Sequence, residues 1–200
     1  MAALAHHFAR AAPGGDPAKA VDYATRAGDR ALALLAHDEA VSYYTQALEL
    51  LDLPGVVPDE ARRCDLLISL GEAQRRAGER AHRRTLLDAA RLAQTRGDAD
   101  GLARAALANN RGIFSVSDAV DAERVAVLEA ALDSLGPGSG ALRPQLLATL
   151  ASELTFSPDY DRRCALGAEA VAAARRLGDP ATLARVLALI QVPLWTPAAR

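Results

Sequence analysis

The sequence has few of the residues on which sheet proteins, disulfide scaffolds and membrane spans depend. Its 200 residues include two cysteines, one methionine, one lysine and only eight aromatic side chains. β-Branched and aromatic residues are too few for a sheet protein. Cys64 and Cys164 form no CxxC pair, so we expect two reduced, buried thiols and no disulfide framework. No apolar run reaches the roughly 20 residues that cross a bilayer.

The balance of charge argues against two further classes of protein. The formal net charge is −2, so the chain lacks the basic excess that is typical of a nucleic-acid-binding domain. The N-terminal run MAALAHHFARAAPGG has no charged region ahead of an apolar core, unlike a signal peptide. We therefore expect a cytoplasmic protein that contacts no membrane and binds no nucleic acid directly.

Alanine and leucine dominate what is present. The chain contains 46 alanines and 30 leucines, which lose little side-chain entropy in a helix. Clusters of glycine and proline divide it into segments of the length of single helices or helix pairs. These features predict an all-α fold.

A repeated motif indicates how the helices are organised. The pattern GDxxxLAR occurs at residues 97–104 and again at 178–185, an offset of 81 residues, which is about two repeats of 40. Such periods are typical of stacked helical hairpins. We therefore predict an antiparallel helix-hairpin solenoid over residues 16–200, with repeats at about 17–54, 60–97, 100–137 and 141–178 and a partial repeat at 180–200.

The first repeat carries small residues where its two helices are expected to cross. Helix axes about 8–10 Å apart need small side chains at the closest contact. Gly28, Ala40 and Ala47 supply them, and Tyr44 is placed to fill the space beside them. The segment DEAVSYYTQALEL at 38–50 resembles the second helix of a tetratricopeptide (TPR) repeat. The resemblance implies a protein-interaction surface.

The second and third repeats follow this pattern less closely. The residues at corresponding places are Gly71, Gly78, Leu87, Ala90, Gly112, Leu128 and Ala131. Arg83 and Arg124, however, stand where a small residue of the second helix is expected.

The partial last repeat has no second helix to cover its apolar side chains. We expect the following residues to be exposed there: Leu187, Leu189, Ile190 and Trp195. Exposed apolar surface promotes association, so the chain is predicted to self-associate or to fray at this end.

The N-terminal region has a more specific resemblance. Residues 4–8 (LAHHF), 15–23 (GDPAKAVDY) and 26–31 (RAGDRA) resemble a junction in large bacterial, actinobacterial-type, ATPase-containing transcriptional regulators of the LuxR family. In that family such segments connect a nucleotide-binding region to a TPR-like array. The resemblance implies a linker helix at 1–13 and a regulatory interaction module within a signal-transduction ATPase. The alternative is a free-standing TPR-like adaptor that binds a peptide of another protein.

The motifs that carry the chemistry of that family are missing from this chain. It has no GxxxxGK[ST] loop to hold phosphate and no basic recognition helix. The resemblance therefore assigns nucleotide hydrolysis and DNA binding to other parts of such a protein. We expect no enzymatic activity, no cofactor and no catalytic residue in this chain.

Two kinds of reactive side chain invite a functional interpretation. His6 and His7 point about 100° apart on a helix, so they form no two-ligand face and we predict no metal site. Cys64 and Cys164 share the context Arg-Arg-Cys, which would favour a thiolate. In Ala/Leu helices, however, cysteine usually serves as a small core residue.

Two candidate binding features remain open. The basic segment 75–84 is either a site for an acidic peptide or phosphate, or a solvated turn between antiparallel helices. Tyr43 and Tyr44 either line a peptide groove or pack, with Tyr44 as the buried residue of the pair.

Overall fold

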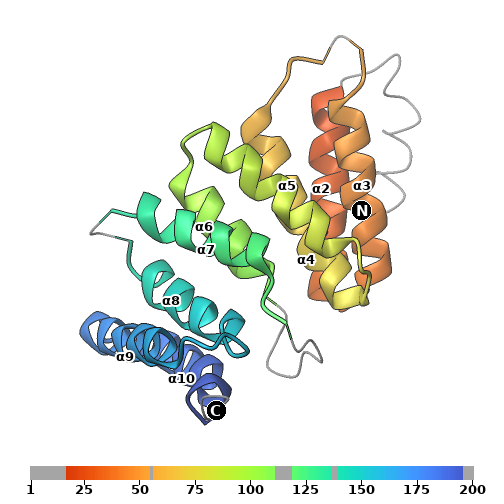
Figure 1. The fold of residues 1–200 in the computed structure, drawn as a ribbon. Coiled ribbons are helices and arrows are strands. Elements are labelled where there is room, and N and C mark those ends of the chain that lie inside the picture. The colour runs from red at the N-terminus through yellow and green to blue at the C-terminus, as the bar shows by residue number, and fades with distance from the viewer. Residues whose placement is uncertain (1–16, 55, 111–118, 137–138, 196–200) are drawn as a thin grey trace. The chain divides into compact units, whose positions relative to one another are not determined.

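The structure is a computed structural model that describes residues 17–54, 56–110, 119–136 and 139–195, with side chains described as far as residue 191. Within these ranges the fold is all-α, as predicted, and there is no strand. The helices are α2 (Pro17–Ala33), α3 (His37–Leu51), α4 (Glu60–Ala77), α5 (His82–Thr95), α6 (Ala99–Ala108), α7 (Ala122–Ser134), α8 (Leu142–Glu153), α9 (Tyr160–Leu177) and α10 (Pro180–Trp195) (Figure 1).

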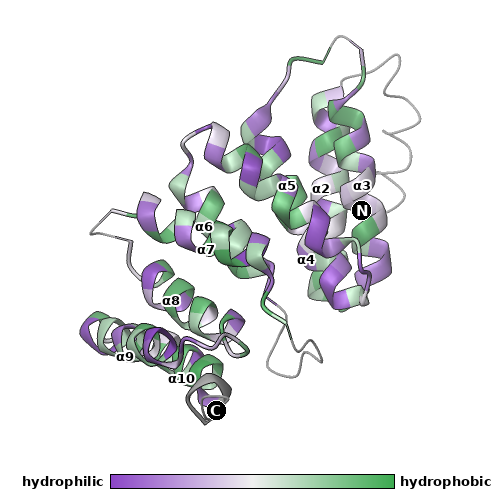
Figure 2. Cartoon of the chain, viewed as in Figure 1, coloured by the Kyte–Doolittle hydropathy of each residue, from purple (hydrophilic) through white to green (hydrophobic). Residues whose placement is uncertain are grey.

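The helices form two compact units, which we call the N-terminal unit (α2–α5) and the C-terminal unit (α6–α10). In the N-terminal unit each helix packs against the next one along the chain. In the C-terminal unit α8 contacts α6, α7, α9 and α10. Green apolar residues and purple polar residues lie on different faces of helices such as α2 and α5 (Figure 2). Burial of the apolar faces stabilises each unit.

Aspartate starts five of the helices. Its side chain accepts a hydrogen bond from the backbone N–H three residues ahead, which has no partner inside the helix. The capping residues are Asp59, Asp98, Asp121, Asp159 and Asp179. The sequence thus encodes the starts of α4, α6, α7, α9 and α10 locally.

Four helix ends in the described residues are followed by a residue with a left-handed backbone, among them α5, which is followed by Gly97 with a φ of 67°. Gly78 after α4 and Gly178 after α9 have φ angles of 79° and 73°, which glycine adopts without steric cost. After α2 the same role falls to Leu35, whose φ is 60°. The Leu35 N–H donates to Leu32 O at 3.0 Å, and the next N–H, of Ala36, reaches back to α2 as well. Because a positive φ is unfavourable for a residue with a Cβ, this end of α2 is strained.

The crossing of α2 and α3 agrees with the sequence pattern. Gly28, Ala40, Tyr44 and Ala47 are all buried. A Cβ atom on Gly28 would lie 2.7 Å from Cε1 of Tyr44, closer than real contacts allow. The absence of a side chain at Gly28 thus makes room for the aromatic ring.

A second crossing, between α4 and α5, repeats this geometry with one correction. A Cβ on Gly71 would lie 2.7 Å from Cδ2 of Leu86, so Leu86 is the residue that packs over the glycine. Leu87, which the spacing predicted, is buried beside it. Gly78, predicted to share the pattern, is instead the residue that ends α4, with nothing within 4 Å of a Cβ. The turn between the helices shifts the register by one residue.

The C-terminal unit has its own apolar core, which corrects the expectation of an open end. Its buried members are Leu147, Ala148, Ala170, Ala174, Val186 and Ile190. Ile190 is only 5% exposed and Leu189 is half-buried, whereas Leu187 is 46% exposed as predicted. Ile190 lies on the buried face of α10 and Leu187 on its exposed face, so only one face of the helix is open. The side chain of Trp195 lies outside the described residues.

Candidate functional site

Tyr44 is a packing residue rather than part of a peptide groove. Its side chain is 1% exposed, and its hydroxyl donates a hydrogen bond to Oδ1 of Asp29 at 2.7 Å. Burial, followed by the hydrogen bond to Asp29, raises the pKa of Tyr44 well above its ordinary value. The phenol therefore stays protonated and joins α3 to α2. Tyr43 is half-buried.

The two Arg-Arg-Cys segments have different environments. Cys64 is buried, and its Sγ donates to Ala89 O at 3.6 Å. Its neighbours Arg62 and Arg63 form surface ion pairs with Asp22 and Asp52. Because these carboxylates hold the guanidinium groups at the surface, Cys64 fits the structural interpretation.

Cys164 lies in the other segment and is half-buried. A hydrogen bond to Cys164 raises the pKa of Tyr160. The preceding Arg163 is 2% exposed, donates to the backbone oxygens of Thr155 and Leu154, and stacks 5.0 Å from the Tyr160 ring centre. Arg163 thus caps the carbonyl end of α8, which suits a cation.

Arg124 occupies the position where a small residue was expected. It is 6% exposed, and its guanidinium lies 3.7 Å from Asp121 and 4.0 Å from the buried carboxylate of Glu153. Asn109 and Thr149 line the same place, where no room remains for a water molecule. The cluster is therefore a packed ionic contact of α6, α7 and α8. Local spacing gave no sign of it, because Glu153 is 29 positions away.

The basic segment predicted from the sequence forms a surface around the turn from α4 to α5. We call it the α4–α5 arginine surface; it comprises Arg75, Arg76, Arg80, Arg83 and Arg84. Arg83, where a small residue was expected, is half-buried here. Arg76 is held by Glu72 at 2.6 Å, but no described residue forms an ion pair with Arg75 or Arg80.

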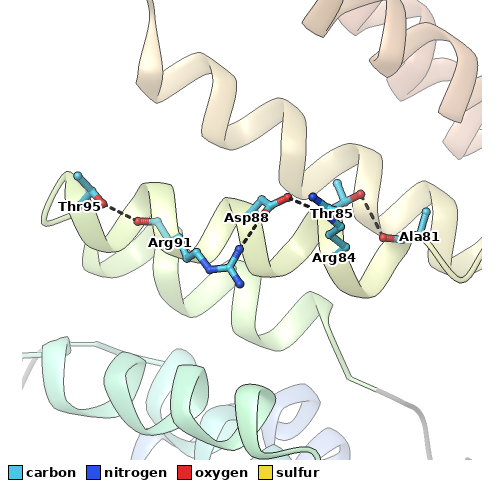
Figure 3. A network of polar contacts seen from close by, with 6 residues as sticks. All are labelled: Ala81, Arg84, Thr85, Asp88, Arg91 and Thr95. Atoms are coloured by element: carbon cyan, nitrogen blue, oxygen red, sulfur yellow. Dashed lines mark hydrogen bonds and ion pairs between the residues drawn. The ribbon is translucent and has the colours of Figure 1, made fainter.

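One carboxylate serves two arginines farther along α5. Asp88 accepts from Arg91 at 2.6 Å and lies 3.9 Å from Arg84, whose side chain is 91% exposed (Figure 3). Thr85 and Thr95, also drawn in Figure 3, bond to backbone oxygens of α5 and leave these charges unchanged. Positive charge is therefore in excess on this surface.

A small apolar cleft, which sequence reasoning missed, lies at the start of α2. Its volume is about 270 Å³, and its lining consists of Pro17, Ala18, Val21, Leu51, Val56, Val57, Asp59 and Arg62. Val57 is 82% exposed at its edge. The volume falls below the roughly 300–1,000 Å³ of small-molecule sites, so it suits one or two apolar side chains.

Other expectations concern residues without a description or groups that are not assembled. The linker helix at 1–13, His6 and His7, and Gly112 lie outside the described residues. In the described part of the chain, no three His, Cys, Asp or Glu side chains come together as a metal site would require. No helix described in the structure has both the length and the apolar character to cross a bilayer.

Comparison with known proteins adds no identification. No protein-family model matches the sequence, and no curated protein matches it significantly.

Proposed function

We propose that this chain is a non-catalytic protein-interaction module built as a TPR-like solenoid. The observation that carries the proposal is the contact of Gly28 with Tyr44, repeated by Gly71 with Leu86. In both hairpins a glycine on the first helix receives a large side chain of the second. Helix hairpins that stack in this way present extended surfaces on which other proteins bind.

The surfaces of the N-terminal unit support binding of a protein rather than a small molecule. The cleft beside α2 has space for about 270 Å³, enough for apolar side chains of a peptide. The α4–α5 arginine surface presents exposed guanidinium groups, which recognise carboxylates. The buried charged residues of the C-terminal unit, Arg124 and Arg163, are engaged in holding helices together.

The resemblance at residues 4–31 supports a place for the module in a cytoplasmic ATPase-type transcriptional regulator of the LuxR family. There it would couple the binding of a partner or a signal to the nucleotide-binding part of the protein. A free-standing adaptor would use the same surfaces. Sequencing the reading frame on both sides of this segment separates the two settings. If the frame encodes no nucleotide-binding segment before it and no helix-turn-helix after it, the regulator is excluded.

Capture from the native host tests the interaction function itself. The full 200-residue chain is immobilised, and proteins retained from a lysate of its host are quantified by mass spectrometry. We expect at least one protein to bind saturably and to be displaced by soluble chain. A matched bait with the crossing disrupted, Gly28→Phe, should lose it. If no protein binds saturably either to the isolated chain or to the natural protein that contains it, the proposed interaction function is wrong.

A further inference from the structure

The positive charge of the N-terminal unit is concentrated in one place. Residues 17–96 carry twelve basic and twelve acidic side chains, so the unit has no overall excess. Residues 75–84, in contrast, contain five arginines and a single carboxylate, Glu79. The α4–α5 arginine surface is therefore a local feature rather than a consequence of the composition.

Part of this charge lies where it does not help the helix. Arg83 and Arg84 belong to the first turn of α5, which holds no acidic residue and whose start at Ala81 has no side-chain cap. The N-terminus of a helix is already positive, so basic side chains there are unfavourable. α8 also has an arginine in its first turn, but Glu169 holds that residue, Arg143, at 3.1 Å. On α5, by comparison, Arg84 shares its carboxylate: Asp88 lies 3.9 Å from Arg84 and 2.6 Å from Arg91.

The turn from α9 to α10 provides an internal comparison. It has the same arginine pair at the end of a helix, Arg175 and Arg176, followed by a left-handed glycine. There, however, Asp179 caps the next helix by accepting from the N–H of Thr182 at 2.9 Å. The arginines of α9 lie at a carbonyl end, where they stabilise the helix. Of these two turns, the α4–α5 turn alone is followed by a helix with arginines in its first turn.

We propose that the α4–α5 arginine surface binds an acidic segment of a partner protein. The proposal rests on the interaction function proposed above and names the chemistry of the partner. Arginine forks bind carboxylates through two parallel hydrogen bonds. Arg80 and Arg84 are both exposed, and Arg84 shares Asp88 with Arg91. A nucleic acid fits less well, because the same unit exposes Asp38, Glu39 and Glu49 on α3, which repel a long polyanion.

Binding of a labelled peptide to the full chain tests this proposal. The probe is a fluorescein-labelled hexaglutamate, measured by anisotropy at low salt, with hexalysine as the peptide control. Arg80→Gln/Arg84→Gln removes two exposed charges, and Arg80→Glu/Arg84→Glu reverses them. The matched control is Arg175→Glu/Arg176→Glu, which changes the similar turn of the C-terminal unit. Helicity and the melting temperature are recorded for every variant.

We expect hexaglutamate, but not hexalysine, to bind the wild type and the control variant equally. The Gln variant should bind several-fold more weakly and the Glu variant about tenfold or more. The Gln variant should melt close to the wild type, because Arg80 lies outside α5 and the unfavourable position of Arg84 in the first turn offsets its exposed contact with Asp88. A residue with only a structural role would instead lower the melting temperature.

Three results would overturn the proposal. The first is that hexaglutamate does not bind the wild type. The second is that it binds the Glu variant and the wild type with equal affinity. The third is that a 20-nucleotide single-stranded DNA binds this surface more tightly than the peptide does. The interaction function would survive each of them if a partner captured from the host still bound the Glu variant.

Discussion

At the scale of single residues, the contact between Gly28 and the ring of Tyr44 sets how closely α2 and α3 approach. One methyl group at Gly28 would lie 2.7 Å from the ring, so Gly28→Ala must displace Tyr44 or separate the helices. We expect a loss of about 1–3 kcal/mol in the free energy of unfolding, the usual cost of overpacking. Urea denaturation measures it. Gly136→Ala, where a Cβ meets nothing within 4 Å, is the control and should change stability little.

The hydroxyl of Tyr44 predicts a dependence on alkaline pH. In the folded chain its pKa lies above the ordinary value of 10.0, so folding favours the protonated phenol. The stabilisation is complete below pH 10 and falls as the pH rises above 10, because the unfolded chain can then ionise. Measured from pH 9 to 11.5, the advantage of the wild type over Tyr44→Phe should therefore be constant up to about pH 10 and shrink above it.

Comparing the two unfolding free energies across this range tests the prediction. The other tyrosines are common to both proteins, so their ionisation cancels in the difference. Tyr43→Phe serves as the control and should retain the pH dependence of the wild type. A constant difference between wild type and Tyr44→Phe would show that the Tyr44 phenol ionises alike in both states.

Residues also show what the sequence could and could not predict. Gly28, Ala40 and Tyr44 were found from spacing, because one crossing of two adjacent helices depends on nearby positions. Leu86 was missed by one position, since the turn at 78–81 decides the register of α5. Arg124 stood out only as an exception to the small-residue pattern and Arg163 only as a neighbour of Cys164. The burial of Arg124 depends on a partner distant in sequence, Glu153, which local spacing does not reveal. The excess of arginine at 75–84 was visible, but its conflict with the start of α5 needed the helix bounds.

At the scale of the helices, the end of α2 stores strain. Leu35 holds a φ of 60° and is 75% exposed, so it gains little from burial. We expect Leu35→Gly to stabilise the protein by about 0.5–1 kcal/mol, despite the greater freedom of glycine in the unfolded chain. Thermal denaturation at neutral pH measures the change.

The neighbouring Leu34 provides the matched control for this helix end. It is 68% exposed, but its φ is not positive. Leu34→Gly should therefore destabilise the protein, because glycine there adds only unfolded-state entropy. If both substitutions had the same sign, the strain assigned to Leu35 would be wrong.

At the scale of the whole molecule, each compact unit has a core of its own. Tyr44 lies in the core of the N-terminal unit, and Ile190, 5% exposed, lies in that of the C-terminal unit. We expect Ile190→Ala to cost about 2–5 kcal/mol and to accelerate hydrogen exchange in α8–α10 but not in α2–α4. Gly28→Ala should give the converse pattern. Equal acceleration everywhere in both variants would mean that the chain unfolds as one body.

The burial of Ile190 also changes the expectation for self-association. Only Leu187 and Leu177 remain as large exposed apolar side chains of α9 and α10 in the described part of the chain. The predicted tendency to associate at this end therefore rests on fewer side chains than the sequence suggested. Light scattering across a concentration series measures it.

The placement of the two cysteines gives the protein a built-in reporter. One thiol is enclosed at the centre of the α4 and α5 hairpin, and the other is partly open to solvent on α9. A brief pulse of a thiol-reactive dye would mark Cys164 at once and Cys64 only when its hairpin opens. The ratio of the two labels would therefore report how often the α4–α5 hairpin opens, with the labelling of Cys164 as the internal reference. No engineered probe is needed.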